Sequence, residues 1–172
     1  MALSKITNGG VASTGLPDGS VLQVVSTDLE STTQLTSSGS ISELSTSLRL
    51  AFTPKSASSS LLLQCFAPFV SPNSANLAYA YFYDVTNSAA VNLATASDSR
   101  TAATWSKRTT AFDINDMDTL NMMTVVSNTN TTARTYTIYH GTEGATHQFL
   151  QSTLSTSAGT STKIIFTITE IG

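Results

Sequence analysis

The acidic run between residues 113 and 118 holds the densest set of metal-binding groups in the chain. Asp113, Asn115, Asp116 and Asp118 bring four oxygen-bearing side chains together, and such oxygens are the ligands that a hard cation such as Ca²⁺ takes. The spacing is not that of an EF-hand, because the sixth position is not glycine and Thr124 stands where a bidentate glutamate is needed. These residues are weak candidates for a metal site. A solvated loop is the preferred interpretation, and we predict no metal and no cofactor.

Other catalytic groups are sparse. His140 and His147 flank a short turn that would place them opposite each other in a hairpin, but two imidazoles make an incomplete zinc site. Histidines at a surface or interface are the preferred interpretation. No Gly-x-Ser-x-Gly motif presents a nucleophilic serine. The single cysteine, Cys65, lies in an apolar run typical of a buried thiol, and one cysteine allows no internal disulfide. We therefore do not expect an enzyme.

Aromatic side chains are the remaining candidates for contact with a ligand or a partner. Trp105, the single tryptophan, lies close to Arg100 in the most basic stretch of the chain. An exposed aromatic ring among polar groups can stack on a sugar; the preferred alternative is that Trp105 closes one end of the fold or anchors a neighbouring subunit. Tyr79, Tyr81 and Tyr83 belong to a run that is apolar or aromatic at every position, which predicts a strand wet on neither face and an interface there.

The elements that must position these residues are strands. Only 11% of the residues are charged, and serine and threonine make up roughly a third of the chain, a balance that favours strands and turns over helices. Strand-like runs recur at 21–25, 47–52, 61–70, 77–85, 89–95, 109–114, 120–127, 134–139, 147–154 and 163–171. We predict an all-β fold, an antiparallel, jelly-roll-like β-sandwich over residues 21–172. The turn at 127–131 is predicted to join two strands as a hairpin.

The two ends of the chain have distinct roles. In the last strand Ile164, Phe166 and Ile168 share one face, so the terminus is expected to be built into the sheet. Residues 1–20 contain turn-forming glycines and few apolar residues, and we interpret them as an extended arm. Leu3, Ile6 and Val11 are its docking side chains.

Charge and hydropathy exclude two classes of partner. The net charge is −3 and the 8 lysines and arginines are scattered, so the chain has no basic stripe for nucleic acid. No apolar run approaches the roughly 20 residues that span a bilayer, and the first residues do not have the layout of a signal peptide.

Residues 2–11 (ALSKITNGGV), followed by 19–25 (GSVLQVV), resemble the start of small tail-fibre-like and virion structural proteins of marine tailed phages of the cyanophage type. Residues 52–63, 132–138 and 168–171 resemble later strands of the same proteins. The resemblance is one of scaffold residues and carries over no catalytic group. It implies a β-rich module on the exterior of the virion that assembles as a homotrimer.

The leading hypothesis is a non-enzymatic virion structural protein, docked on other virion proteins through its N-terminal arm as a capsid decoration, a head fibre or part of a tail fibre. The alternative is a fibre tip that binds a host receptor or surface glycan. Decoration implies many copies per particle and a tip implies few. A small depolymerase is a third hypothesis, for which residues 113–118 are the single acidic cluster.

Overall fold

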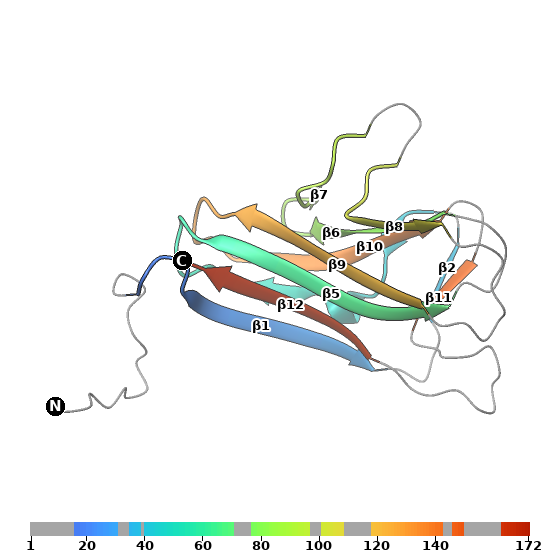
Figure 1. The fold of residues 1–172 in the computed structure, drawn as a ribbon, viewed down its shortest axis with the longest axis horizontal. Coiled ribbons are helices and arrows are strands. Elements are labelled where there is room, and N and C mark those ends of the chain that lie inside the picture. Colours follow the sequence, from blue (N-terminus) through green and yellow to red (C-terminus); the bar gives the residue numbers. More distant parts are fainter. Residues whose placement is uncertain are drawn as a thin grey trace.

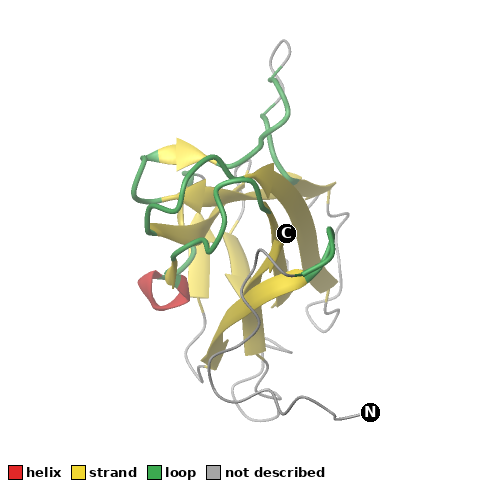
Figure 2. Cartoon of the chain, turned by 90° about the vertical axis from the view of Figure 1, so that its left-hand side faces the viewer, coloured by secondary structure: helices red, strands yellow, loops and turns green. Residues whose placement is uncertain are grey.

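The computed structural model describes residues 16–30, 35–38, 40–70, 77–96, 101–108, 118–142, 146–149 and 163–172. Its regular elements there are antiparallel strands and one 3₁₀ turn (Figure 1), which confirms the all-β prediction. The strands are β1 (Val21–Glu30), β2 (Leu35–Ser38), β3 (Ser42–Glu43), β4 (Leu50–Phe52), β5 (Ser60–Val70), β6 (Leu77–Asp84), β7 (Ala89–Ala90), β8 (Trp105–Arg108), β9 (Asp118–Ser127), β10 (Arg134–Thr142), β11 (Thr146–Phe149) and β12 (Lys163–Ile171). The 3₁₀ turn η2 (Thr46–Leu48) lies beside the strands in Figure 2.

The strands form two sheets of six, which we call sheet A and sheet B. In sheet A, β12 lies between β1 and β5, and β9 pairs with the opposite edge of β5. The short strands β11 and β2 extend this sheet beyond the end of β12. In sheet B, β10 pairs with β6 on one edge and with β3 and β4 on the other, and β6 carries β7 and β8 on its far edge.

Most of the predicted strands that fall on described residues are present, with shifted ends. β1 continues to Glu30, five residues beyond the predicted end, because Thr27 and Leu29 keep the alternation of half-buried and exposed positions. The predicted strand at 47–52 is shortened by η2 to Leu50–Phe52, and that at 89–95 is reduced to Ala89–Ala90. The predicted strand at 109–114 lies outside the described residues.

The predicted hairpin at 127–131 is wrong, because β9 belongs to sheet A and β10 to sheet B. Each of these two strands has one apolar face. The apolar face of β9 contacts the core from sheet A, and that of β10 contacts it from sheet B. The buried Asn128 fixes the crossing: its backbone N–H donates to the Ser59 carbonyl at 2.8 Å, and its amide Nδ2 donates to the Ser56 carbonyl. The chain therefore passes from one sheet to the other at this point instead of turning back within one sheet.

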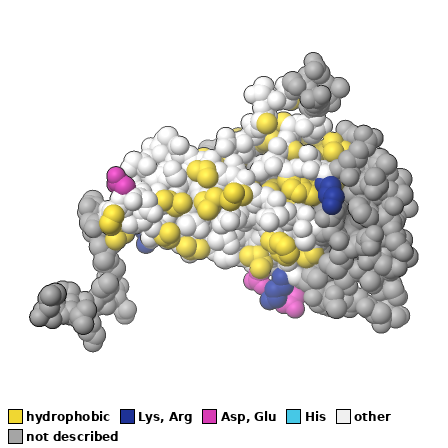
Figure 3. Space-filling model, viewed as in Figure 1, with side chains coloured by type: hydrophobic (Ala, Val, Ile, Leu, Met, Phe, Trp, Pro, Cys, Tyr) yellow, Lys and Arg dark blue, Asp and Glu magenta, His cyan; other side chains and the backbone are white. Residues whose placement is uncertain are grey.

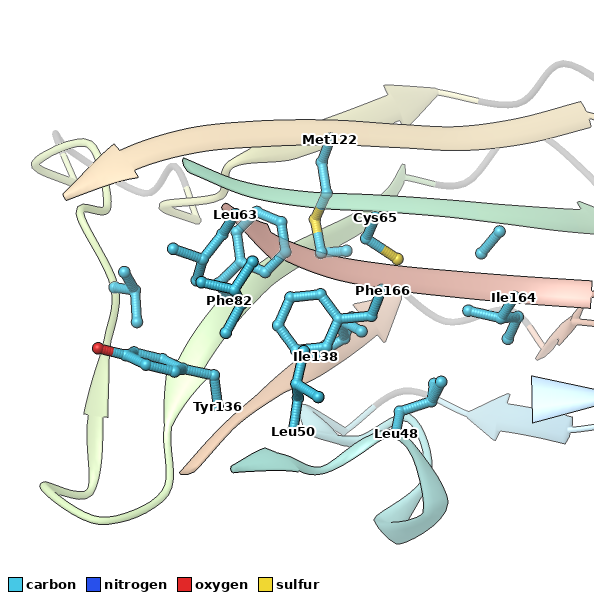
Figure 4. Close-up of a cluster of buried hydrophobic side chains, with 14 of the residues drawn as sticks. Leu48, Leu50, Leu63, Cys65, Phe82, Met122, Tyr136, Ile138, Ile164 and Phe166 are labelled. Carbon is cyan, nitrogen blue, oxygen red and sulfur yellow. The ribbon is translucent and has the colours of Figure 1, made fainter. Parts of the chain in front are cut away.

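The core is the layer of buried hydrophobic side chains between the two sheets (Figure 4). Ile164, Phe166 and Ile168 of β12 are fully buried, as the alternation of the last strand predicts. Phe166 stacks on Phe82 of β6, with ring centroids 5.6 Å apart, and so joins sheet A to sheet B. Stacked aromatic pairs of this kind stabilise a core beyond their buried area.

The inward face of β12 ends in a buried carboxylate. Glu170 is 0% exposed, yet both of its oxygens are hydrogen-bonded. The backbone N–H groups of Lys55 and Ser56 donate to it at 2.9 Å, the Ser59 hydroxyl at 2.7 Å and the Gln23 amide at 2.7 Å. Burial raises the pKa of Glu170, but the combined hydrogen bonds outweigh it, so that the pKa lies below its ordinary value. One side chain thus ties β12 to β1 and to the loop between β4 and β5.

The segment before β1 is fixed to the end of the chain. The Gly19 N–H donates to the Gly172 carbonyl, and the Gly172 N–H donates to the Ser20 carbonyl at 2.9 Å. Gly19 has a φ of 83°, a left-handed conformation that favours glycine. The last residues of the predicted arm therefore belong to the sandwich, whereas residues 1–15, with Leu3, Ile6 and Val11, lie outside the described part.

None of the described segments contains a helix long and apolar enough to cross a membrane.

Replacing Phe166 by alanine should lower the free energy of unfolding by about 3 to 5 kcal/mol, because it leaves a cavity between the sheets. Thr167→Ala is the matched control on the outer face of the same strand. It loses a hydroxyl contact with Ser26 at 3.0 Å and should cost about 1 kcal/mol or less. Thermal and urea melts compare the two variants. Equal losses would mean that β12 is tightly packed on both faces.

Replacing Glu170 by glutamine should lower the free energy of unfolding by about 2 to 4 kcal/mol at pH 7, because an amide NH₂ then meets hydrogen-bond donors. The pKa of Glu170 is depressed in the folded state, so its charge stabilises the fold above the unfolded pKa, and this contribution is lost as pH falls through the folded pKa. The gap between wild type and variant should therefore narrow in acid.

Urea melts between pH 7 and pH 3 measure this gap. Asp18→Asn, at an exposed position just before β1, is the control and should change stability by less than about 0.5 kcal/mol. A gap for Glu170→Gln that stays constant down to pH 3 would contradict the assignment of the carboxylate as the charged, stabilising form.

Candidate interaction surface

Several of the predicted site residues fall outside the part of the chain that can be described. Asp118 opens β9, but its side chain is among those not described. Four more of these predicted site residues lie outside the described ranges, namely Arg100, Asp113, Asn115 and Asp116. Among the described residues, no group of three or more His, Cys, Asp or Glu side chains is placed to hold a metal ion.

The two histidines do not face each other across a hairpin, and the preferred prediction of surface histidines is wrong for His140, which is buried. His140 lies in β10 of sheet B and is 1% exposed, whereas His147 lies in β11 of sheet A. β10 pairs with β3, β4 and β6, and β11 pairs with β2 and β5. The strands separate because each contributes to a different layer of the sandwich.

Cys65 points into the core from β5 and is 2% exposed. Burial raises the pKa of its thiol to about 12. The thiolate is the nucleophilic form of cysteine, so this side chain stays protonated and unreactive at neutral pH. The prediction of a buried core thiol is confirmed.

The three tyrosines of β6 lie on the outer face of sheet B together with Tyr139 of β10. Tyr139 stacks on Tyr81, its direct cross-strand partner, at 5.8 Å and on Tyr83 at 4.2 Å. Tyr79 and Tyr81 are 6% and 9% exposed, and burial together with the neighbouring tyrosines raises the pKa of Tyr81. These two rings therefore offer a partner almost no surface, and Tyr83 is the half-exposed member of the row.

Gly141 makes room for the first ring of this row. It pairs with Tyr79 across the strands, and a Cβ at this position would lie 2.6 Å from three atoms at the tip of the tyrosine side chain. The ring thus lies over the glycine and covers a position without a side chain. Trp105 behaves differently: it is half-buried at the edge strand β8 and packs against the hydrophobic core.

Most of the large hydrophobic side chains that are exposed in the described part of the chain lie on the outer face of sheet A, which sequence reasoning did not identify. Val24 of β1, Ile165 of β12, Phe66 of β5, and Met123 and Val125 of β9 point outward and are between 42% and 62% exposed. Register places Ile165 beside Phe66, and Leu62 beside Val125. Figure 3, which has the same view as Figure 1, shows hydrophobic side chains spread over the side of the molecule that sheet A forms. We call this surface the sheet A face.

A sequence signal for this face existed. A strand with one wet side alternates, but adjacent apolar pairs occur at Met122 and Met123, at Val125 and Val126, and at Ile164 and Ile165. One member of each pair fills or lines the core and the other points outward. Such doublets indicate a strand with apolar groups on both faces.

Charge on the sheet A face lies at its margin. The Lys163 amine forms ion pairs with Asp28 at 3.1 Å and Glu30 at 2.9 Å, and hydrogen bonding to Glu30 raises the pKa of Lys163. The middle of the face carries hydroxyl and amide groups instead, where Ser26 and Thr167 lie 3.0 Å apart and Gln64 adjoins them by register. The described part of the face is therefore apolar and nearly neutral.

The face also has a shallow hollow of about 330 Å³. Its lining residues, none of them charged, are Gln64, Cys65, Phe66, Asn121, Ile165 and Thr167. Met123 adjoins it, because Met123 pairs with Gln64 across β5 and β9. The arrangement suits burial of an apolar side chain from a partner.

A second hollow, of about 230 Å³, lies at the turn between β6 and β7, and its lining includes charged side chains. Asp84 and Arg134 are 3.9 Å apart there, and burial raises the pKa of Tyr136 nearby. The Asp84 carboxylate already accepts from the backbone and the side-chain amide of Asn87, at 3.0 and 2.7 Å. Its carboxylate thus stabilises the turn, which leaves less of it for a ligand.

The chain matches no protein-family model, and no curated protein is significantly similar to it.

Proposed function

We propose that this chain is a structural module on the exterior of a tailed-phage virion, without enzymatic activity, which assembles as a homotrimer and docks through its N-terminal residues. The observation that carries the proposal is the sheet A face, whose large side chains are exposed in five places on four adjacent strands. Contiguous apolar surface of this kind marks a site of protein association in soluble proteins. The resemblance of the N-terminal residues to tail-fibre-like proteins supplies the setting.

The strand order supports a jelly-roll form of the sandwich. Eight principal strands remain when β3 with β4 and β7 with β8 are taken as single broken strands and the short strands β2 and β11 are set aside. The first of these eight pairs with the eighth, and the third with the sixth, in sheet A. In sheet B the second pairs with the seventh and the fourth with the fifth. This nested pairing is that of a long hairpin rolled into two sheets, and jelly rolls of eight strands are common in viral capsid proteins.

The contacts at Gly19 and Ser20 support docking through the preceding residues. They hold the start of the sandwich against Gly172, so the described chain begins at a fixed point of the fold. Glycine-rich segments such as the one at Gly9 and Gly10 become ordered mainly on the surface of a partner. A neighbouring virion protein is the partner that this proposal requires.

Deletion of residues 1–15 should leave the free energy of unfolding unchanged within about 0.5 kcal/mol, because the hydrogen bonds at Gly19, Ser20 and Gly172 are kept. The same deletion should abolish incorporation into particles. Urea melts and quantification of the chain in purified particles are the two measurements. A truncated protein that fails to fold, or that still joins particles, contradicts the role of the arm.

Location on the particle tests the proposal as a whole. Antibodies raised against the folded chain should label the outside of particles of the tailed phage that encodes it, and electron microscopy should place many copies on each particle. Labelling of a few copies at fibre ends would favour the receptor- or glycan-binding tip instead. Absence of the chain from purified particles would refute a virion role.

A further inference from the structure

We propose that the sheet A face is where copies of this chain bind one another. The inference rests on the proposed homotrimer and identifies its contact surface, which the sequence predicts at the tyrosines of β6. Tyr79 and Tyr81 are buried within the chain itself, whereas Val24, Met123 and Val125 are each more than half exposed.

The size of the face suits a stable interface. Four neighbouring strands about 4.8 Å apart, each nine to eleven residues long at about 3.3 Å per residue, cover a flat area of roughly 600 Å². The accessible surface of such a pleated face, with its side chains, is larger than the flat area. A standard interface buries about 800 Å² on each partner. In a trimer one sheet A face is shared between two neighbouring copies, and the area that each chain contributes is on the scale of one standard interface.

Charge favours a second copy of this chain as the occupant. The whole protein is slightly acidic, with a net charge of −3. If its acidic side chains were gathered on the contact surface, two copies would repel each other there. The described centre of the sheet A face has no charged side chain, and at its margin Lys163 is already paired with Asp28 and Glu30. A neutral, apolar surface can meet its own copy without leaving an unpaired charge buried.

Shape supports the same occupant. The hollow beside Gln64, Phe66 and Ile165 lies next to Met123, which is 62% exposed and projects from the neighbouring strand. One face thus presents both a hollow and a flexible apolar side chain that can fill the hollow of a neighbouring copy. A face that carries both parts of the contact lets each copy fill the hollow of the next copy around a closed ring, and methionine adapts well to irregular apolar gaps.

A charge placed on the face tests the proposal. The wild type should have the mass of three chains by multi-angle light scattering, while Met123→Lys should raise the concentration of half-dissociation by at least about 100-fold, because it buries an unpaired charge. Ile41→Lys is the matched control: Ile41 is 47% exposed, lies just before β3 of sheet B, and should leave assembly unchanged. Circular dichroism melts establish that both variants are folded.

Thiol labelling provides a second measurement that does not depend on introducing charge. Cys65 is buried with a pKa of about 12, so a cysteine placed on the surface is the one that reacts at neutral pH. Met123→Cys should react with a maleimide much more slowly in the assembled protein than after dilution below the dissociation concentration. Ile41→Cys should react equally fast in both states.

The outcomes separate this inference from the proposed function. A trimer whose mass is unchanged by Met123→Lys, or in which the Met123→Cys variant labels freely, places the interface elsewhere and leaves the virion role standing. A wild type that is monomeric at high micromolar concentration overturns the inference, while location on particles is tested independently. A wild-type dimer that Met123→Lys dissociates supports the face and overturns the threefold symmetry.

Discussion

One end of the sandwich depends on the hydrogen bonds that the buried carboxylate of Glu170 accepts. At this end the loop between β4 and β5 connects the two sheets. A charge removed from water is costly unless hydrogen bonds replace its hydration. Glu170 receives such bonds from the loop between β4 and β5 and from Gln23 of β1. The loop connects sheet B to sheet A, so the same set of bonds that solvates the charge also sets how the sheets meet.

Asn128 reinforces this junction from the other crossing point. Its backbone and side chain hold Ser56 and Ser59, the same loop that donates to Glu170. The chain thus changes sheets twice at one end of the molecule, and the buried residues Glu170, Ser59 and Asn128 form hydrogen bonds at these two crossings. Serine suits such a position, because its short side chain donates and accepts without filling space that the core requires.

The two faces of sheet A show how one strand pattern serves two surfaces. Inward residues of β12 and β5 fill the core, while outward residues of the same strands form a neutral apolar area crossed by hydroxyl and amide groups. Sheet B differs, because its outward tyrosines stack on one another and two of them are buried within the chain. The sheet A face therefore has apolar side chains left for a partner, and the tyrosine row of sheet B has few.

Composition and alternation alone determined the fold class and most of the long strands. Thr-rich, weakly charged runs with a period of two, such as residues 163–171, form strands in almost any packed setting, because the alternation itself defines a core side. The burial of Cys65 was predicted from its apolar run, but the same run did not reveal that Phe66 beside it points outward and is 42% exposed. Only the tertiary structure decided which strands are neighbours and which apolar residues stay exposed. Short connections favour hairpins, yet β9 and β10 lie in different sheets because Asn128 bonds to a loop 72 residues away in the chain. The tyrosines of β6 and the apolar doublets of β9 and β12 appear equally hydrophobic in sequence. Their exposure differs because the burial of a side chain depends on which other groups pack against its face of the sheet. That packing is a property of the assembled sheets rather than of any one strand.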